Sequence, residues 1–168
     1  MKKIITNFFT IFMIVLLSNN LNAQNITTDA ASASATIITP ITITNTTALN
    51  FGDIVNGIGI VTLSTVGERA TDYQAFSGTQ TGIVTAASFD ITGQGAYTYA
   101  IILPTSDVTL TEPGGGTMTV NSFVSDPSGV GTLTAGAGSV LVGASLNIVQ
   151  GLEIGVYDGS FDVTVAYN

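Results

Sequence analysis

The chain has 168 residues and is acidic but sparsely charged, with three Lys and Arg residues, eleven Asp and Glu residues and a formal net charge of −8. Nucleic-acid binding is excluded, because it depends on Lys and Arg side chains that neutralise phosphates. Binding to anionic lipid headgroups fails for the same reason. The sequence contains no cysteine and no histidine, which excludes disulfides and thiol chemistry.

The first residues have the organisation of a secretory signal peptide. Lys2 and Lys3 precede an apolar run over residues 8–17, and Ala23 is a small residue at the expected cleavage position. The apolar run has about half of the roughly 20 residues that a membrane span needs. We therefore expect residues 1–23 to be cleaved and the mature protein to reach the periplasm, the cell surface or the medium without stable membrane insertion. An uncleaved anchor is the alternative.

Cleavage would leave Arg69 as the one basic residue and a net charge of about −10. A serine hydrolase site would lack the histidine that takes the serine proton, and the mature chain has no Lys to replace it. The missing Lys also excludes an isopeptide crosslink. We expect a protein that is not an enzyme, uses no cofactor or metal, and assembles without covalent bonds.

Downstream of the signal, short segments alternate between apolar and polar residues, each bounded by Gly, Asn, Asp or Pro. This is the period of β-strands. The apolar positions are, in chain order, Ile41 and Ile43; Leu49 and Phe51; Val61 and Leu63; Ala87, Phe89 and Ile91; Tyr97, Tyr99, Ile101 and Leu103; Val108 and Leu110; Met118, Val120 and Val124; Val140, Val142, Ala144, Leu146 and Ile148; and Phe161, Val163, Val165 and Tyr167. They predict an all-β fold: an antiparallel, immunoglobulin-like β-sandwich with Greek-key character and about eight to ten short strands over residues 40–168.

Several turns are marked by their residue types. Asn56-Gly57 and Asp158-Gly159 favour the positive φ angles of two-residue hairpins. Pro127, in the sequence DPSG, favours a tight reversal. The glycines of residues 114–116 are followed by neither Lys-Ser nor Lys-Thr, so they indicate a hairpin connection and not a phosphate-binding loop.

Two pairs of acidic residues are candidate sites for metal binding or hydrolysis. Asp158 and Asp162 flank a turn, and Glu68 and Asp72 lie on either side of Arg69. Calcium takes about six to eight oxygens from denser acidic loops, and glycoside hydrolysis needs two carboxylates at a fixed separation. We therefore expect these acids to form turns and to face water.

Tyrosine rings on one face of a strand could stack against sugars and form a glycan-binding site. Tyr97 and Tyr99 share one face of a predicted strand with Ile101, so we expect both in the core and not in a glycan site. The other tyrosines are Tyr73, Tyr157 and Tyr167.

Residues 30–45, AASASATIITPITITN, alternate for longer than a typical strand. Pro40 divides this stretch, since proline cannot donate to a central ladder. Residues 41–44 are then the first strand of the domain, and residues 24–39 form an N-terminal extension. The last predicted strand reaches the end of the chain, and only Asp162 gives its edge a charge, although exposed edges are normally blunted.

We expect the extension to add as a strand to another copy of the chain, beside the edge of that last strand. Pairing within the same chain as an ordinary edge strand, or fraying as a polar leader, is the alternative. The residues expected at the contact are Ala31, Ala33, Ala35 and Ile37 on the donor segment, and Phe161, Val163, Val165 and Tyr167 beside the acceptor groove.

Three segments carry a resemblance to a known family: LNFGDIV at residues 49–55, GGGTMTVNSFVSDPSG at residues 114–129 and GSFDVTVAYN at residues 159–168. They resemble a secreted bacterial family of Bacteroidota and Proteobacteria, domain of unknown function 4402, over nearly all of the mature chain. More distantly, the chain is similar to spore coat protein U and the archaic chaperone-usher pilins. That similarity implies an incomplete sandwich that lends an N-terminal strand to the next subunit. The chain differs from those pilins by lacking cysteines and by having alanines where donor strands carry larger groups.

Together, these features predict a secreted structural protein, a fimbrial or filament-like surface subunit that associates with itself or with a related subunit. A periplasmic chaperone is a second candidate partner. The alternative is a monomeric extracellular module that binds glycans or acts as an adhesin. A third interpretation is a small outer-membrane β-barrel, which the short, Gly-rich strands without aromatic girdles oppose.

Overall fold

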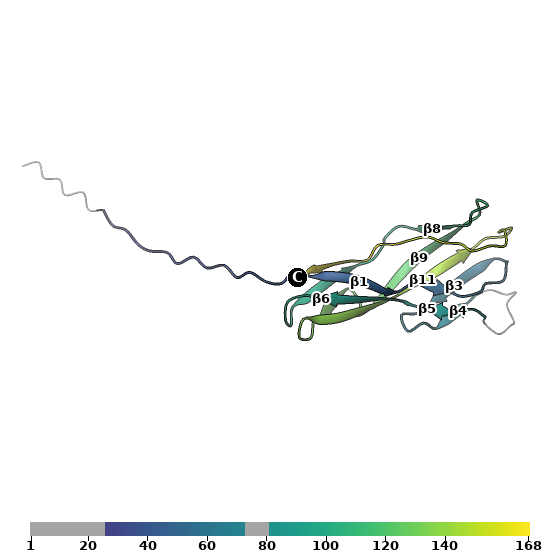
Figure 1. The fold of residues 1–168 in the computed structure, drawn as a ribbon. Helices are drawn as coiled ribbons and strands as arrows, with labels where there is room; N and C mark the ends of the chain where they lie inside the picture. Colours follow the sequence, from purple (N-terminus) through teal and green to yellow (C-terminus); the bar gives the residue numbers. More distant parts are fainter. Residues whose placement is uncertain (1–25, 73–80) are drawn as a thin grey trace, which may run out of the picture. The chain divides into compact units, whose positions relative to one another are not determined.

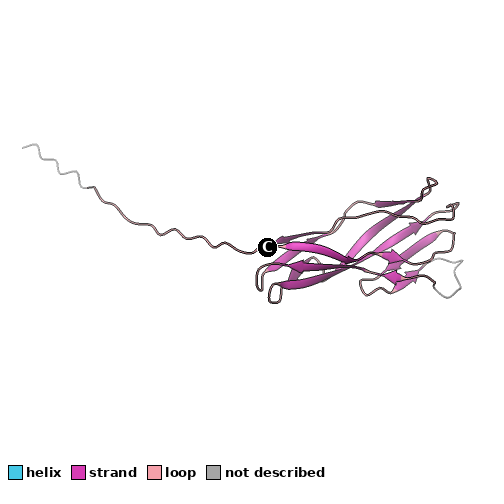
Figure 2. Cartoon of the chain, in the orientation of Figure 1, coloured by secondary structure: helices cyan, strands magenta, loops and turns pink. Residues whose placement is uncertain are grey.

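The alternating segments fold into strands joined by loops (Figures 1 and 2). The structure is a computed structural model that describes residues 26–72 and 81–168, so the predicted signal peptide and Tyr73 lie outside the described residues. The chain divides into two units, Met1–Thr36 and Ile37–Asn168. Residues 26–36 of the first unit belong to no strand, and their side chains are exposed. In the described residues no helix has the length and apolar character needed to span a membrane.

The second unit is built from antiparallel strands. Those in the described residues are β1 (Thr42–Thr47), β2 (Asn50–Phe51), β3 (Gly59–Leu63), β4 (Arg69–Thr71), β5 (Val84–Thr85), β6 (Ala87–Thr92), β7 (Thr98–Ile102), β8 (Val108–Thr111), β9 (Thr117–Asp126), β10 (Val130–Thr132), β11 (Ala137–Ile148) and β12 (Thr164–Tyr167). The predicted all-β antiparallel sandwich is confirmed. The strands outnumber those predicted because β4, β5 and β10 have only two or three residues, too few for alternation to mark them.

The strands form a large sheet and two small ones. The large sheet has the order β1-β6-β11-β3-β4, with β9 and then β8 on the other side of β11; the small sheets are β10-β7-β12 and β2-β5. β11 organises the large sheet, because its first half pairs with β6 and its second half with β3. Its opposite edge pairs with β9, and Figure 1 shows β11 between β9 and β3.

Gly143 lies where β11 exchanges β6 for β3 as its neighbour. A Cβ atom at this position would collide with the carbonyl oxygen of Leu63 and would lie 2.8 Å from the carbonyl carbon of Ser64. These are backbone atoms, which cannot turn aside as a flexible side chain can. The close approach of the two strands therefore requires glycine.

Two clusters of buried side chains make up the core. The first contains Ala87, Phe89, Ile91, Tyr99, Ile101, Leu133, Val140 and Val142, and the second contains Phe51, Val61, Leu63, Val120, Ala144, Leu146 and Ile148. Apart from Leu133, which follows β10 and was not predicted, both consist of residues at the alternating positions that the sequence predicted. β7 contributes Tyr99 and Ile101 to the first cluster only, so the sheet β10-β7-β12 covers that cluster and not the second.

Two of the predicted turns are wrong. Gly57 connects β2 to β3, which belong to different sheets, and Asp158 forms an isolated bridge with Thr111. Neither dipeptide therefore closes a hairpin, because the segments on its two sides do not pair with each other. The predicted connection at residues 114–116 is confirmed: it joins β8 to β9, and Glu112 N donates to Gly116 O at 2.9 Å.

Two residues predicted to be inside are exposed. Val124 is 50% exposed because Ser122 has a φ of 52° and the register of β9 shifts against β11 at a bulge. Phe123 packs against the core in its place. Tyr97 is 45% exposed, since it precedes β7 and its ring meets Tyr167 edge-on, with centroids 5.6 Å apart.

We predict that Gly143→Ala lowers the free energy of unfolding by about 2–3 kcal/mol, because overpacking against backbone cannot relax. Ser139→Ala, at an exposed position of the same strand, is the control and should change stability by less than about 0.5 kcal/mol. Urea denaturation of both variants measures the difference. Equal midpoints for Gly143→Ala and the unmodified domain would show that the strands do not meet this closely.

Candidate functional site

The second layer of the sandwich is incomplete. The three-stranded sheet covers the first core cluster, whereas the strands that lie over the second cluster are β2 and β5, with two residues each, joined by loop residues such as Ile54 and Leu152. A groove with a volume of about 700 Å³ lies beside these short strands. One half of the large sheet is therefore not fully covered by a second layer.

The groove has an apolar floor and two walls. The floor consists of side chains of β8, β9 and β11: Val108, Leu110, Met118, Val120 and Leu146. One wall is formed by residues 48–54 and the other by residues 155–159 and Phe161, with Ile83 at the side. The carboxylates in this lining are Asp53 and Asp158. The groove therefore offers mainly apolar contacts and backbone hydrogen-bonding groups.

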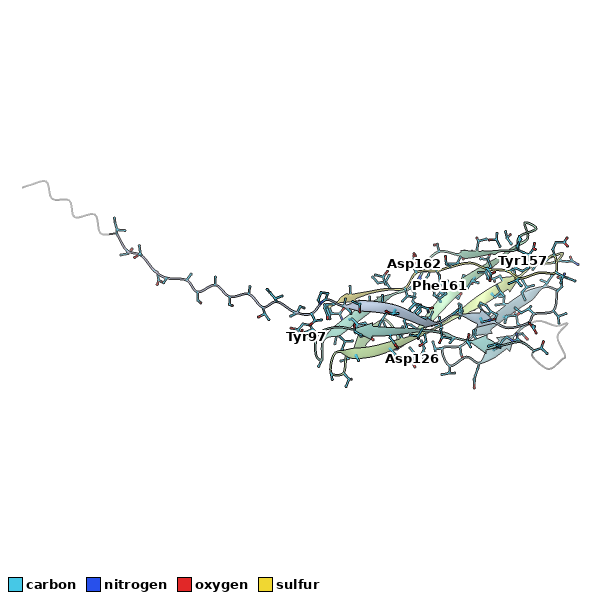
Figure 3. The ribbon with its side chains drawn as sticks, viewed as in Figure 1. Tyr97, Asp126, Tyr157, Phe161 and Asp162 are labelled. Carbon is cyan, nitrogen blue, oxygen red and sulfur yellow. The ribbon has the colours of Figure 1, made fainter. Side chains whose placement is uncertain are left out.

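The groove extends from the middle of the sandwich to one end. In Figure 3, Phe161 lies near the middle and Tyr157 near the end opposite to Tyr97. Toward the Tyr97 end, β1 and β12 come together. At the Tyr157 end, Val156 of the lining is 71% exposed, and we call this end the groove mouth. Ile83, at the side of the groove, is 76% exposed. Apolar surface exposed in a groove is typical of interaction sites.

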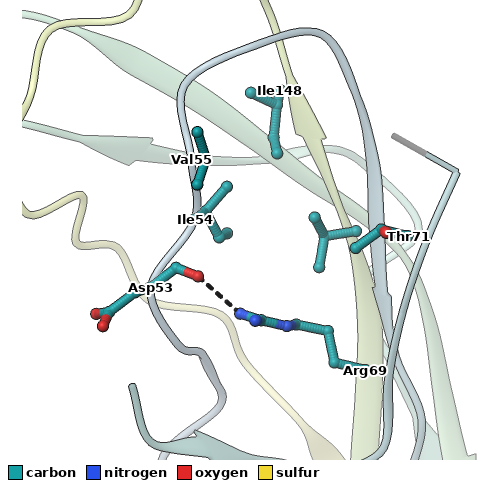
Figure 4. Close-up of a pocket in the computed structure, with 7 residues that line it drawn as sticks. Asp53, Ile54, Val55, Arg69, Thr71 and Ile148 are labelled. Atoms are coloured by element: carbon teal, nitrogen blue, oxygen red, sulfur yellow. Dashed lines mark hydrogen bonds between the residues drawn. The ribbon is translucent and has the colours of Figure 1, made fainter. Parts of the chain in front are cut away.

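Arg69 holds the first wall in place. It extends from β4, which pairs with β3, and its Nη1 donates to Phe51 O at 2.5 Å. The same Nη1 donates to Asp53 O at 2.9 Å (Figure 4). Gly52 between these residues has a φ of 72°, in the left-handed region that favours glycine. One guanidinium therefore fixes the turn that forms the wall.

The second wall is held by backbone pairing with β8. Thr111 N donates to Asp158 O at 2.9 Å, and Asp158 N donates to Thr111 O at 3.0 Å. Tyr157 Oη donates to Glu153 O at 3.0 Å. In the adjoining loop, Asn56 Nδ2 donates to Leu152 O at 2.7 Å, which joins the two loops at this end. Both walls are therefore attached to the sandwich independently of any occupant.

The predicted contact residues fall into three groups. Ala31, Ala33, Ala35 and Ile37 are exposed and belong to no strand, with Ile37 98% exposed. Phe161 lines the groove. Val163, Val165 and Tyr167 pack against the first core cluster, and β12 is the edge strand of its sheet.

Sequence reasoning missed most of the groove lining. The floor residues were recognised as inward-facing, but alternation does not show whether a second layer covers them. The walls lie largely outside regular strands, and their signal in the sequence is weak. Ile154 and Val156 are apolar residues outside any alternating segment. Their position is the sequence signal that could have indicated an exposed apolar loop.

The acids near Arg69 form the hydrogen bonds expected of a turn. Asp72 Oδ1 accepts from Ile60 N at 2.6 Å, and the backbone and side chain of Ser64 bond to the backbone of Glu68. Within residues 26–72 and 81–168, no three His, Cys, Asp or Glu side chains form a group that could hold a metal ion.

We predict that Arg69→Met loosens the first wall, because two backbone carbonyls lose a charged donor worth about 1.5–3 kcal/mol. Amide hydrogen exchange of residues 50–54 should accelerate, while that of β6 and β11 should change little. Arg69→Lys is the matched control: it keeps the charge but not the planar fork and should restore only part of the protection. Unchanged exchange in Arg69→Met would show that another contact holds the wall.

The comparisons with known proteins place the whole sandwich in one family. Residues 41–167 match the family described as "Domain of unknown function (DUF4402)", a range that includes β1 to β12 and all residues that line the groove. No curated protein and no solved structure matches the chain. The chain belongs to the DUF4402 family.

Proposed function

We propose that the protein is an exported structural subunit that assembles by β-strand addition, with residues 31–37 of one copy occupying the groove of the next. The observation that supports this most is the groove itself, whose apolar floor and attached walls leave a place for one more extended segment. Pairing of an extended segment in such a place is a recurrent mode of recognition, in which main-chain hydrogen bonds give affinity and alternate side chains give specificity.

The donor segment suits this groove in length and polarity. Seven extended residues span about 24 Å, close to the length of a typical strand. Ala31, Ala33, Ala35 and Ile37 would face the floor, while the alternate serines and threonine would face water. The segment carries no charge, so it avoids repulsion from the two carboxylates of the groove lining.

The small donor side chains bring the backbone near the floor. Alanines bury little apolar surface, so most of the binding free energy of this segment would come from main-chain hydrogen bonds, at about 1 kcal/mol each. Ile37 supplies the one large side chain. Because the walls are already attached to the sandwich, little ordering of the acceptor would be needed on binding, which favours affinity.

We predict that deletion of residues 24–37 abolishes assembly and leaves a folded, monomeric domain that binds a synthetic peptide of residues 30–39. Light scattering and unheated denaturing gels report assembly, and fluorescence anisotropy of a labelled peptide reports binding. Assembly that survives the deletion would contradict the proposal. A monomeric protein that binds glycans and not the peptide would favour the glycan-binding alternative.

Two altered peptides test which face of the donor enters the groove. A peptide with Ala33→Asp and Ala35→Asp should bind at least tenfold more weakly than the unmodified peptide, because two carboxylates would be buried. The matched control, with Ser32→Asp and Ser34→Asp, has the same added charge on the opposite face and should keep most of the affinity. If both altered peptides bind equally weakly, the two faces of the donor strand are equivalent, and the alanine face does not enter the groove specifically.

A further inference from the structure

We propose that consecutive copies also contact each other directly, body to body. The sandwich end around Tyr97 in one copy would pack against the apolar rim, Ile154 and Val156, at the groove mouth of the next. The partner is a second copy of this chain. This inference rests on the proposed strand addition and adds a second interface to it.

The root of the extension is tied to its own sandwich. Thr39 N donates to Gln94 Oε1 at 3.0 Å, and Thr39 O accepts from Tyr167 Oη at 2.9 Å. Gln94 N in turn donates to Tyr167 Oη at 2.5 Å. We call Thr39, Gln94 and Tyr167 the clamp. Both backbone groups of Thr39 are thus held by side chains from the β6–β7 loop and from β12.

The clamp leaves almost no free tether. One residue, Ile38, separates Ile37 from Thr39, so the Cα atoms of Ile37 and Thr39 are at most about 7 Å apart. When Ile37 sits in the groove of the next copy, the clamp must lie within about that distance of the groove. The surface around the clamp is then forced against the neighbouring sandwich.

The groove mouth is suited to this contact. Ile154 is 98% exposed and Val156 is 71% exposed, which leaves the rim without cover within the described part of one copy. Tyr97, beside the clamp, is 45% exposed and is buttressed by the ring of Tyr167. A tyrosine that meets exposed aliphatic side chains is typical of the centre of an interface.

The distribution of charge also favours contact between the clamp end of one copy and the groove mouth of the next. Residues 93–97 and 133–136 form adjoining loops beside the clamp, joined by Gly93 N to Gly136 O at 2.9 Å, and neither loop has a charged side chain. The chain as a whole has a net charge of −8, so like-charge repulsion between copies is weakest where one side is neutral. Glu153 and Asp158 near the rim would thus face an uncharged surface.

The two surfaces lie at opposite ends of the sandwich. Figure 3 shows Tyr97 at one end and Tyr157, next to Val156, at the other. A contact between unlike ends repeats from copy to copy, and an open repeat of this kind produces a filament when its rotation does not close a ring. The short tether would make that filament stiff.

Engineered cysteines test the contact, because the chain has none of its own. Ile154→Cys is combined with Ala96→Cys or with Ala135→Cys, two exposed positions in the loops beside the clamp, in the full-length protein. A short bismaleimide should link assembled copies into a ladder that survives boiling in detergent. The control pair, Ile154→Cys with Ser139→Cys on the outer face of β11, should give at least tenfold less linked product.

A flexible insertion separates this inference from the proposed function. A six-residue Gly-Ser linker between Ile38 and Thr39 should preserve assembly and peptide binding but reduce crosslinking to the level of the control pair. Assembly without crosslinking above that control in either cysteine pair would overturn the body contact and leave strand addition intact. Absence of both assembly and peptide binding would overturn the proposed function and this inference together.

Discussion

The second layer of the sandwich is smaller than the large sheet, and this difference in size is the constraint on which the structure depends. The large sheet presents two clusters of apolar side chains on its inner face, but the sheet β10-β7-β12 covers only the first. Apolar surface removed from water contributes about 25 cal/mol for each Å², so a floor left open in a groove forgoes stabilisation that another strand would supply. The domain tolerates this because β2, β5 and the two walls cover part of the second cluster.

The walls explain why the groove does not close on itself. A groove between mobile loops would be expected to collapse onto its own apolar floor, as cavities do when their surroundings can relax. Here Arg69 attaches one wall to β4, and the bridge between Asp158 and Thr111 attaches the other to β8. The proposed acceptor is thus prepared in advance, and the modest, alanine-rich donor would be complemented by a body contact. Two weak contacts joined by a short tether reinforce each other through effective concentration.

The sequence predicted those features that depend on a local pattern of residues. Alternation identified the buried positions of β6 and β11, because each strand has one face on the core, and the family motifs indicated the family. It failed at Asn56-Gly57, because a turn signal does not show which sheets the flanking strands join. It also failed at Val124, because the bulge at Ser122 reverses the faces locally. The groove could not be predicted from the sequence for a related reason. Whether a second layer covers a sheet face depends on the pairing of strands that lie far apart in the sequence.

The most direct test of the central claim is amide hydrogen exchange of a protein of residues 24–168 in its assembled form. Strand addition predicts that the amides of alternate residues between 31 and 37 become protected to the degree of strand amides, together with amides of the groove walls, and that dilution to monomers removes this protection. Assembled protein in which residues 31–37 exchange as fast as an unstructured peptide would contradict the account, since the groove would then have another occupant or none.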